Sequence, residues 1–190
     1  MKNILILLIT VVLSSSFIAD YGEPHYVYWE SPTGLTWDDF KGRPNAGSSH
    51  HAYSMLGLAY EVKSNTSSEV TFIISAYLDK SNSWVKSGQK TDRLLKHEQK
   101  HFDICELHRR MFVKALTDIE FFTYANVNSK IKNIFNDINN KVDKMQVDYD
   151  RDTQHSRIED QQKIWDQKIS DLLIEFEDHT EIEITVDLRK

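Results

Sequence analysis

The segment that most constrains the fold of this chain is residues 94–104, which reads LLKHEQKHFDI. It contains two histidines four residues apart, His97 and His101, with Glu98 directly after the first. On a helix of 3.6 residues per turn, such positions lie about 40° apart around the axis, so both imidazoles can reach one metal ion. Glu98 points about 100° away from His97, close enough to contact a water molecule on that ion. The HExxH pattern therefore predicts a helix with a zinc site and a catalytic carboxylate.

A long amphipathic helix is predicted around this segment, from about Thr91 to Tyr124. Its apolar face consists of two neighbouring stripes: Leu94, His97, His101, Ile104, His108, Met111 and Ala115, and beside them Leu95, Glu98, Phe102, Cys105, Phe112 and Leu116. The motif residues therefore face the interior, where unpaired imidazole and carboxylate groups are costly and a metal ion would pair with them. The alternative is a core helix with hydrogen-bonded histidines and a salt-bridged Glu98.

Strands are predicted before this helix and at the end of the chain. Residues 51–63 alternate and residues 69–78 are rich in β-branched and aromatic side chains, with turn chemistry at 64–68, so they predict an antiparallel hairpin. Strict alternation in residues 181–188 predicts a half-exposed strand that can join this hairpin. The large apolar residues of segment 35–40 are expected to dock on the core.

Two further helices complete the expected fold. One is predicted at about residues 129–146, followed by a break at 147–155. A capping box formed by Ser156 and Glu159 predicts that another helix opens at Ser156. We expect an α+β fold, in which a small antiparallel sheet packs beside a helical bundle carrying the HExxH helix, as in a zincin-like domain.

The first residues predict export. Met1 to about Ala19 contains one lysine, an apolar run and small serines, which is typical of a secretory signal peptide cleaved near Ser16 or Ala19. The alternative is an uncleaved N-terminal anchor, and both leave the folded part exported. The expected domains are a signal peptide at 1–19 and a single zincin-like metallopeptidase domain at 20–190. The single cysteine, Cys105, excludes an intrachain disulfide, so the domain must rely on its core, to which a bound metal can add stability.

Composition narrows the class of partner. The net charge is −6, and the 27% of charged residues include both signs, which argues against a nucleic-acid-binding surface. Hydrophobic residues make up 40% of the chain, enough for a core, so global disorder is not expected. We expect a peptide or protein substrate, no nucleic acid, and no stable membrane insertion after signal removal.

A catalytic zinc ion needs three protein ligands and an open position for water, so a third ligand must accompany His97 and His101. Cys105 lies about 12 Å along the helix axis from His97, a gap that metal bonds of about 2 Å cannot close. Glu106 points to the opposite side of the helix, and His108 is also too far along it. The third ligand is therefore expected outside this helix.

The best candidates lie in the predicted break between the second and third helices, where Asp148, Asp150, Asp152 and His155 can fold back over the first helix. We favour His155, which the capping box places just before a helix start, and keep Asp150 as the second choice. Asp150 or Asp103 could instead accept a hydrogen bond from the N–H of a ligand imidazole.

The expected chemistry is metal-assisted hydrolysis. Zinc lowers the pKa of its bound water and polarises the scissile carbonyl. Glu98 then acts as the general base that takes the water proton and returns it to the leaving amine. Tyr149, or His108 if it turns inward, is a candidate for stabilising the oxyanion.

Several separated motifs occur in a fixed order along the chain: Leu35-Thr-Trp37-x-Asp39-Phe40-x-Gly42, Ser83-Trp84-Val85, Leu94-Leu95-x-His97-Glu98-Gln99-x-His101-Phe102-Asp103, Tyr149-Asp150-x-x-Thr153-x-His155 and Gln162-x-x-Trp165. Together they resemble the DUF922 family, bacterial secreted proteins described as zinc-dependent proteases. The resemblance covers nearly all of the chain after the leader. It implies metal-site roles for His97, Glu98 and His101, and it supports His155 as the third ligand. Ser156 is a departure, because the family often has Gly there.

The leading interpretation is an exported zinc metallopeptidase in which His97, His101 and His155 hold Zn2+. One alternative is a zinc amidase that acts on cell-wall peptides. Another is a non-catalytic envelope or binding protein with a structural or lost metal site. Retention of Glu98 favours catalysis, because a structural site does not need a carboxylate beside its ligands. A fourth tight protein ligand would favour a closed structural site.

Overall fold

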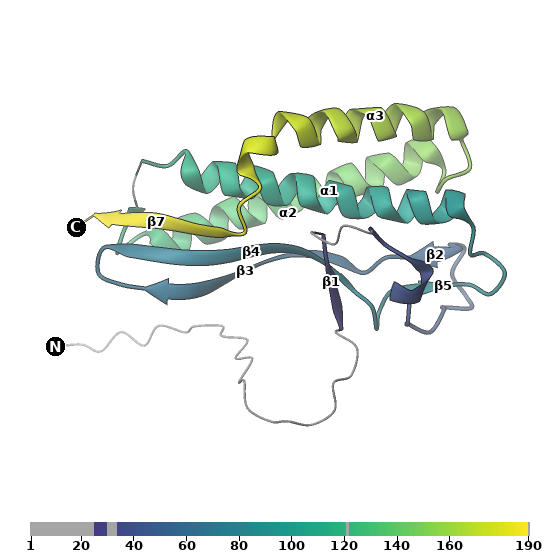
Figure 1. The fold of residues 1–190 in the computed structure, drawn as a ribbon, viewed down its shortest axis with the longest axis horizontal. Helices are drawn as coiled ribbons and strands as arrows, with labels where there is room; N and C mark the ends of the chain where they lie inside the picture. Colours follow the sequence, from purple (N-terminus) through teal and green to yellow (C-terminus); the bar gives the residue numbers. More distant parts are fainter. Residues whose placement is uncertain (1–24, 30–33, 121, 190) are drawn as a thin grey trace, which may run out of the picture.

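The computed structural model describes residues 25–29, 34–120 and 122–189, in which three α-helices lie on one side of a sheet, with α1 against the sheet and α3 farthest from it (Figure 1). The predicted α+β class is confirmed. The signal peptide predicted at residues 1–19 lies outside the described residues. No helix in the described part of the chain is both long and apolar enough to cross a membrane.

The sheet is built on a long hairpin of β3 (Leu56–Asn65) and β4 (Glu69–Asp79), as predicted. Strand β4 also pairs antiparallel with β1 (Tyr26–Tyr28) near one end and with β7 (Glu183–Arg189) near the other, so the C-terminal strand joins the hairpin. At the edge, β6 (Phe122–Thr123) runs parallel to β7. The sheet is therefore mixed, which corrects the expected antiparallel sheet at this one pair.

The first predicted strand is interrupted before β3. Its start forms β2 (Ala52–Tyr53), which pairs with β5 (Trp84–Val85) in a separate two-stranded sheet. Between β2 and β3, the N–H of Met55 donates to the hydroxyl of Ser83 at 2.9 Å, and the carbonyl of Met55 accepts from Asp79 at 2.8 Å. These bonds hold the segment between the strands against the end of β4, beside helix α1.

The helices differ from the predicted ones mainly in where they end. Helix α1 (Asp92–Thr117) begins after Thr91, whose side chain accepts from the N–H of Leu94, and it ends before the predicted Tyr124. Helix α2 (Val127–Thr153) continues through the break predicted at 147–155. Helix α3 (Glu159–Glu175) has Ile158 as its N-cap, so the predicted capping box at Ser156 is wrong.

Helix α2 continues because its residues keep a helical pattern of burial and charge. Tyr149 and Thr153 are buried on one side, four residues apart. On the other side, Asp148 forms ion pairs with Lys144 and Arg151, one turn before and after it. Such pairs stabilise the exposed face of a helix, so the acidic residues belong to a helix and not to a hydrated turn.

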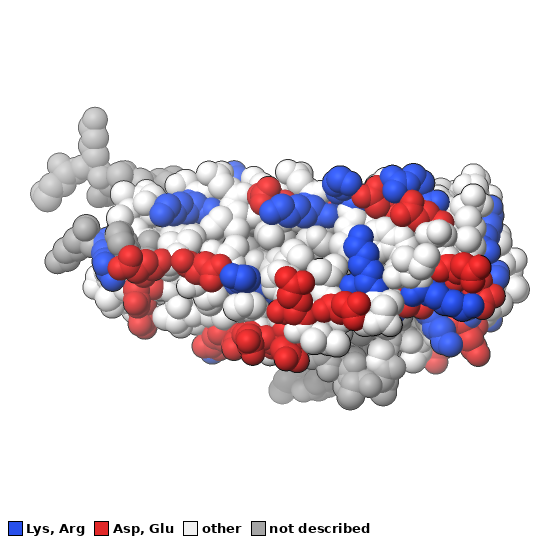
Figure 2. Space-filling view, turned by 90° about the horizontal axis from the view of Figure 1, so that it is seen from above, with Lys and Arg blue, Asp and Glu red and all other residues white. Residues whose placement is uncertain are grey.

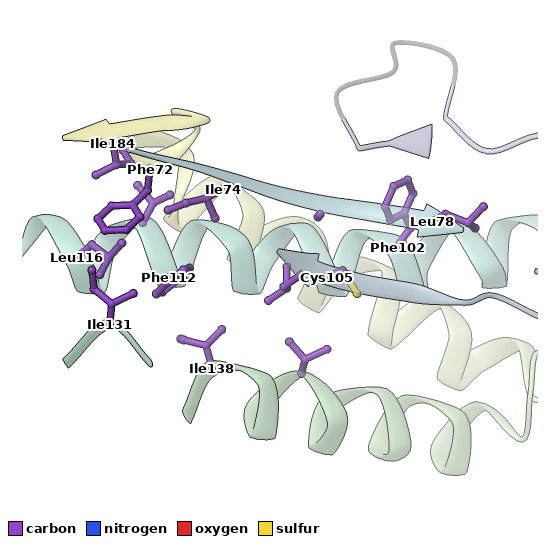
Figure 3. Packing of buried hydrophobic residues seen from close by; sticks show 14 of the residues in the cluster. Phe72, Ile74, Leu78, Phe102, Cys105, Phe112, Leu116, Ile131, Ile138 and Ile184 are labelled. Carbon is purple, nitrogen blue, oxygen red and sulfur yellow. The ribbon is translucent and has the colours of Figure 1, made fainter. Parts of the chain in front are cut away.

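Helix α1 lies at the centre of the molecule and contacts the sheet, α2 and α3. Figure 3 shows its apolar face between β4 and α2; the labelled residues are Phe72, Ile74, Leu78, Phe102, Cys105, Phe112, Leu116, Ile131, Ile138 and Ile184. Burial raises the pKa of the Cys105 thiol to about 12, and this cysteine is a core residue on the apolar face where the sequence pattern placed it. Leu35 and Phe40 pack on this core, as expected for segment 35–40. The helix that carries the HExxH pattern thus lies between the sheet and the other two helices.

Buried charges join α1 to the C-terminal part of the chain. Glu106 accepts two hydrogen bonds from Arg109, at 2.7 and 2.9 Å, and one from Arg110 at 2.8 Å, and all three side chains are buried. Arg109 also donates to the carbonyls of Thr180 and Glu181, which lie just before β7. This network fixes the entry of β7 relative to α1. Charged side chains on the surface do not form one such network. Acidic and basic side chains are interspersed over the face shown in Figure 2.

Replacing Glu106 by Gln should destabilise the protein by about 3–5 kcal/mol, because two buried guanidinium groups lose their counter-charge. The measurement is the free energy of unfolding in urea. The control is Asp137→Asn, which removes one member of an exposed ion pair with Lys141 and should change stability by less than about 1 kcal/mol. Equal effects of the two substitutions would contradict the role given to Glu106.

Candidate metal centre

Four side chains meet where the start of α1 faces the end of α2. His97 and His101 come from α1, Asp150 from the last turn of α2, and His155 from the turn that follows. The Oδ1 atom of Asp150 lies 3.1 Å from Nε2 of His97, 3.1 Å from Nε2 of His101 and 3.0 Å from Nδ1 of His155. The structure therefore places the three predicted ligands together and adds Asp150 to them.

The spacing of these atoms fits a small metal ion. The two Nε2 atoms of His97 and His101 are 3.2 Å apart, close to the separations from Asp150. Ligand atoms bonded tetrahedrally to zinc at about 2.0–2.1 Å lie about 3.3–3.4 Å from one another. The ligand atoms of His97, Asp150 and His155 all lie within 4.8 Å of one another and form a group that could hold a metal ion. Imidazole nitrogens and a carboxylate oxygen are also the donors that zinc accepts.

A glutamine on α3 determines which ring nitrogen of His97 carries the proton. The amide nitrogen of Gln162 donates to the hydroxyl of Tyr149 at 2.6 Å and to Asp166 at 2.8 Å. Its carbonyl oxygen, Oε1, is left to accept from Nδ1 of His97, at 3.1 Å. In the neutral imidazole only one nitrogen carries a proton, so Nε2 of His97 presents a lone pair to the cluster.

Gln146 on α2 fixes His101 in the same way. Its amide nitrogen donates to the carbonyl of His101 at 2.9 Å and to the sulfur of Cys105 at 3.5 Å. Its Oε1 pairs closely with Nδ1 of His101 and accepts the proton there. Two neutral imidazoles and one carboxylate then direct lone pairs at one another across about 3 Å, an arrangement that requires a cation between them.

A proton is the simplest cation that can fill this position. Burial opposes the charging of His101, but its hydrogen bond to Asp150 and the charges of Glu98 and Asp150 outweigh this and raise its pKa. Burial likewise opposes ionisation of Asp150, but hydrogen bonds from His101 and His97 hold its pKa well below the usual range. A metal ion would take the place of the shared protons and leave both imidazoles neutral.

His155 is directed into the cluster by an unusual turn. Gln154, His155 and Ser156 have φ angles of 47°, 53° and 69°, so three consecutive residues without glycine are left-handed. Such residues cost about 1 kcal/mol or more each, and they persist only where surrounding contacts hold them. The N–H of His155 donates to the carbonyl of Asp150 at 3.1 Å, and Ser156 is buried. Strained backbone of this kind is concentrated at functional sites.

Glu98 lies beside the cluster in the wall of a cleft of about 860 Å3. Its side chain is only 5% exposed, and its Oε2 accepts a hydrogen bond of 2.6 Å from the hydroxyl of Ser54. Ser54 belongs to the segment between β2 and β3 that Ser83 holds in place. The cleft is therefore bounded by α1, by the β2–β3 segment and by α2, and the four clustered side chains line its wall.

Other residues considered for the site have different roles in the structure. The Tyr149 hydroxyl is buried, donates to the carbonyl of His97 at 3.3 Å, and its ring stacks on that of His97 at 4.6 Å, so it supports the cluster from below. His108 is buried in the core and donates to the carbonyl of Ile104 at 2.8 Å. Asp103 binds Trp29, Gln99 and Lys100 and not a cluster imidazole.

Comparison with known protein families gives a match that includes most residues of this site. A family model described as "Bacterial protein of unknown function (DUF922)" matches residues 42–156, more than half of the chain. The chain belongs to the DUF922 family. The matched region contains all four clustered side chains and Glu98, whereas residues 35–41 of the first motif and the Gln162-x-x-Trp165 motif lie outside it. No curated protein and no solved structure matches the chain.

Several residues of this DUF922 site were not predicted from the sequence. Gln146 and Gln162 fix the imidazole protons, and Ser54 binds Glu98, but each does so across long sequence separations. Gln162 did belong to the Gln162-x-x-Trp165 motif, which was the only sign of its role. An inward-facing glutamine on an amphipathic helix is a signal that can be searched for beside an HExxH helix.

Replacing Gln162 by Leu should lower zinc affinity about 10- to 100-fold, because Nδ1 of His97 loses the acceptor that keeps Nε2 unprotonated. The measurement is competition for zinc with a chromophoric chelator. The control is Gln167→Leu, an exposed position on the same helix, which should leave the affinity unchanged. An unchanged affinity in a folded Gln162→Leu protein would refute this role.

Proposed function

We propose that this protein is an exported zinc-dependent metallopeptidase. The observation that carries the proposal is a cluster of imidazole and carboxylate lone pairs beside the buried carboxylate of Glu98, in the wall of an open cleft. Export is proposed from the signal-like sequence of residues 1–19. The HExxH pattern, in which the two histidines hold the metal and the glutamate acts on water, supports the same class.

The donor set fits zinc, and a bound zinc ion would activate a water molecule and polarise the scissile carbonyl. His97 and His101 would hold it through their Nε2 atoms, with Asp150 and His155 as the remaining ligands, and the water would take a fifth position, a coordination number that zinc in catalytic sites can reach. Gln162 and Gln146 keep the imidazoles in the required tautomers.

Glu98 is placed to move the proton. Its carboxylate lines the cleft next to His97 and His101, and it is the group that would accept a proton from the attacking water and deliver it to the leaving amine. The hydrogen bond from Ser54 to Oε2 fixes the orientation of the carboxylate. Because Ser54 is held through Ser83 and β4, the general base is supported by the sheet as well as by its own helix.

A second candidate function is favoured by the fourth ligand. Asp150 lies within 3.1 Å of all three ligand nitrogens, so His97, His101, Asp150 and His155 could close a tetrahedral site. A closed site is typical of structural zinc, in an envelope or binding protein without catalysis. Glu98 and the open cleft favour the hydrolase. An amidase that acts on cell-wall peptides would use the same groups on a different bond.

Replacing Glu98 by Gln should leave zinc bound and lower the rate of hydrolysis about 10²- to 10⁴-fold, because the general base is lost. The measurement is cleavage of a mixed peptide library, with cell-wall peptides as a separate arm, followed by mass spectrometry. Glu61→Gln, an exposed change on β3, is the matched control. A zinc-loaded wild type that cleaves neither substrate would favour the structural function, and full activity of Glu98→Gln would exclude Glu98 as the base.

Single substitutions can test which of the clustered residues bind zinc. His155→Ala and Asp150→Ala should each lower zinc affinity by more than about 100-fold. Removing a residue that only hydrogen-bonds a metal ligand lowers the affinity by about 100-fold at most. His51→Ala is the control, because His51 lines the same cleft and does not belong to the cluster. Full zinc occupancy of one variant at equimolar metal would remove that residue from the ligand set.

A further inference from the structure

The cleft beside the cluster has an uneven distribution of charge. Three carboxylates line it: Glu98, Asp143 and Asp150. Among the described residues, the only Lys or Arg side chain in its wall is Arg157. Arg157 keeps its positive charge at any physiological pH, so it creates one fixed cationic position in an otherwise acidic cleft.

The position of Arg157 is fixed by the turn that holds His155. It follows His155 by two residues, which limits the separation of their Cα atoms to about 7 Å. Before it, Ser156 is buried, and after it the N–H of Ile158 donates to the carbonyl of Thr153 at 2.9 Å. The backbone is therefore tied to the end of α2 on both sides of Arg157. The Cα atom of Arg157 is therefore held close to the metal cluster.

The guanidinium is also available for binding. Within the described residues it forms no hydrogen bond or ion pair, and its side chain is exposed. The carboxylates near it in the sequence have other partners: Asp148 and Asp152 bind Arg151, Asp150 binds the cluster histidines, and Glu159 and Asp160 bind Lys163. A free arginine in the wall of a cleft binds carboxylates readily, because its planar fork donates two parallel hydrogen bonds.

We propose that Arg157 forms a carboxylate-binding subsite of the metal cleft, so that the preferred substrate carries a carboxylate close to the scissile bond. This inference rests on the proposed function. The carboxylate can be the free C-terminus of the substrate or an acidic side chain, since both offer the same two oxygens. Because the Cα atoms of His155 and Arg157 lie within about 7 Å, the length of about two extended residues, we expect this carboxylate within a few residues of the bond that is cleaved.

The test uses two hydroxamates of equal length, which bind zinc directly and differ only at the far end. Succinohydroxamic acid ends in a carboxylate, and butyrohydroxamic acid ends in a methyl group. The zinc-loaded protein should bind the succinyl compound about five- to tenfold more tightly, as measured by titration calorimetry. In Arg157→Gln this preference should disappear, while the affinity for butyrohydroxamic acid stays the same.

The control is Lys132→Gln, which removes one positive charge at a position about 27 Å from Asp150 along α2. This variant should keep the preference for succinohydroxamic acid. Equal binding of the two compounds by the wild type, or a preference that persists in Arg157→Gln, would overturn the subsite. If neither compound binds to the zinc-loaded protein, the metal has no open position, and the proposed hydrolase fails together with the subsite. Binding of butyrohydroxamic acid without a preference leaves the hydrolase standing and rejects the subsite alone.

Three longer probes distinguish a C-terminal carboxylate from the carboxylate of an acidic side chain. They are succinyl hydroxamates coupled to alanine with a free C-terminus, to alaninamide, and to glutamic acid with an amidated C-terminus. Tighter binding of the first than of the second assigns the subsite to a substrate C-terminus. Tighter binding of the third than of the second assigns it to an acidic side chain. Equal binding of all three contradicts the proposal.

Discussion

The hydrogen bonds from Gln162 to His97 and from Gln146 to His101 determine what this site can do. Each glutamine has its amide N–H groups occupied by fixed acceptors, so only its carbonyl is left for the histidine. The proton of each imidazole is thereby held on Nδ1, on the side away from the cluster. A buried pair of imidazoles without these glutamines could rotate or change tautomer and satisfy itself. With them, the pair is committed to an external cation.

The fold is arranged so that these glutamines stay in register with the histidines. Helix α1 is enclosed by the sheet on one side and by α2 and α3 on the others, and each partner contributes one element of the site. The segment between β2 and β3 supplies Ser54, α2 supplies Gln146 and Asp150, and α3 supplies Gln162. Tyr149 lies under the histidines and connects α2 to α3 through its hydroxyl, so a shift of either helix would disturb both imidazoles.

Much of this arrangement could be predicted from local patterns. The 3-4 spacing on residues 94–116 placed His97, His101 and Glu98 on the inner face of a helix, and the structure has them there. The position of the segment that contains Asp150 and His155, beside these histidines, was also predicted. Its conformation was not, because a run of acidic residues suggests a hydrated turn until the ion pairs of Asp148 and the burial of Tyr149 are taken into account. The parallel pairing of β6 and the roles of Gln146 and Ser54 depend on contacts between distant segments, which periodicity does not report.

The left-handed turn at Gln154–Ser156 has a consequence for how an ion would enter and leave. A backbone conformation that is unfavourable by itself is held by its contacts, and one of these is the contact of His155 with the cluster. Without an ion, this turn is the part of the site with the least reason to stay closed, whereas His97 and His101 are anchored in the core. Local opening of the site is therefore expected to begin at this turn, which makes the turn the route by which an ion would enter and leave.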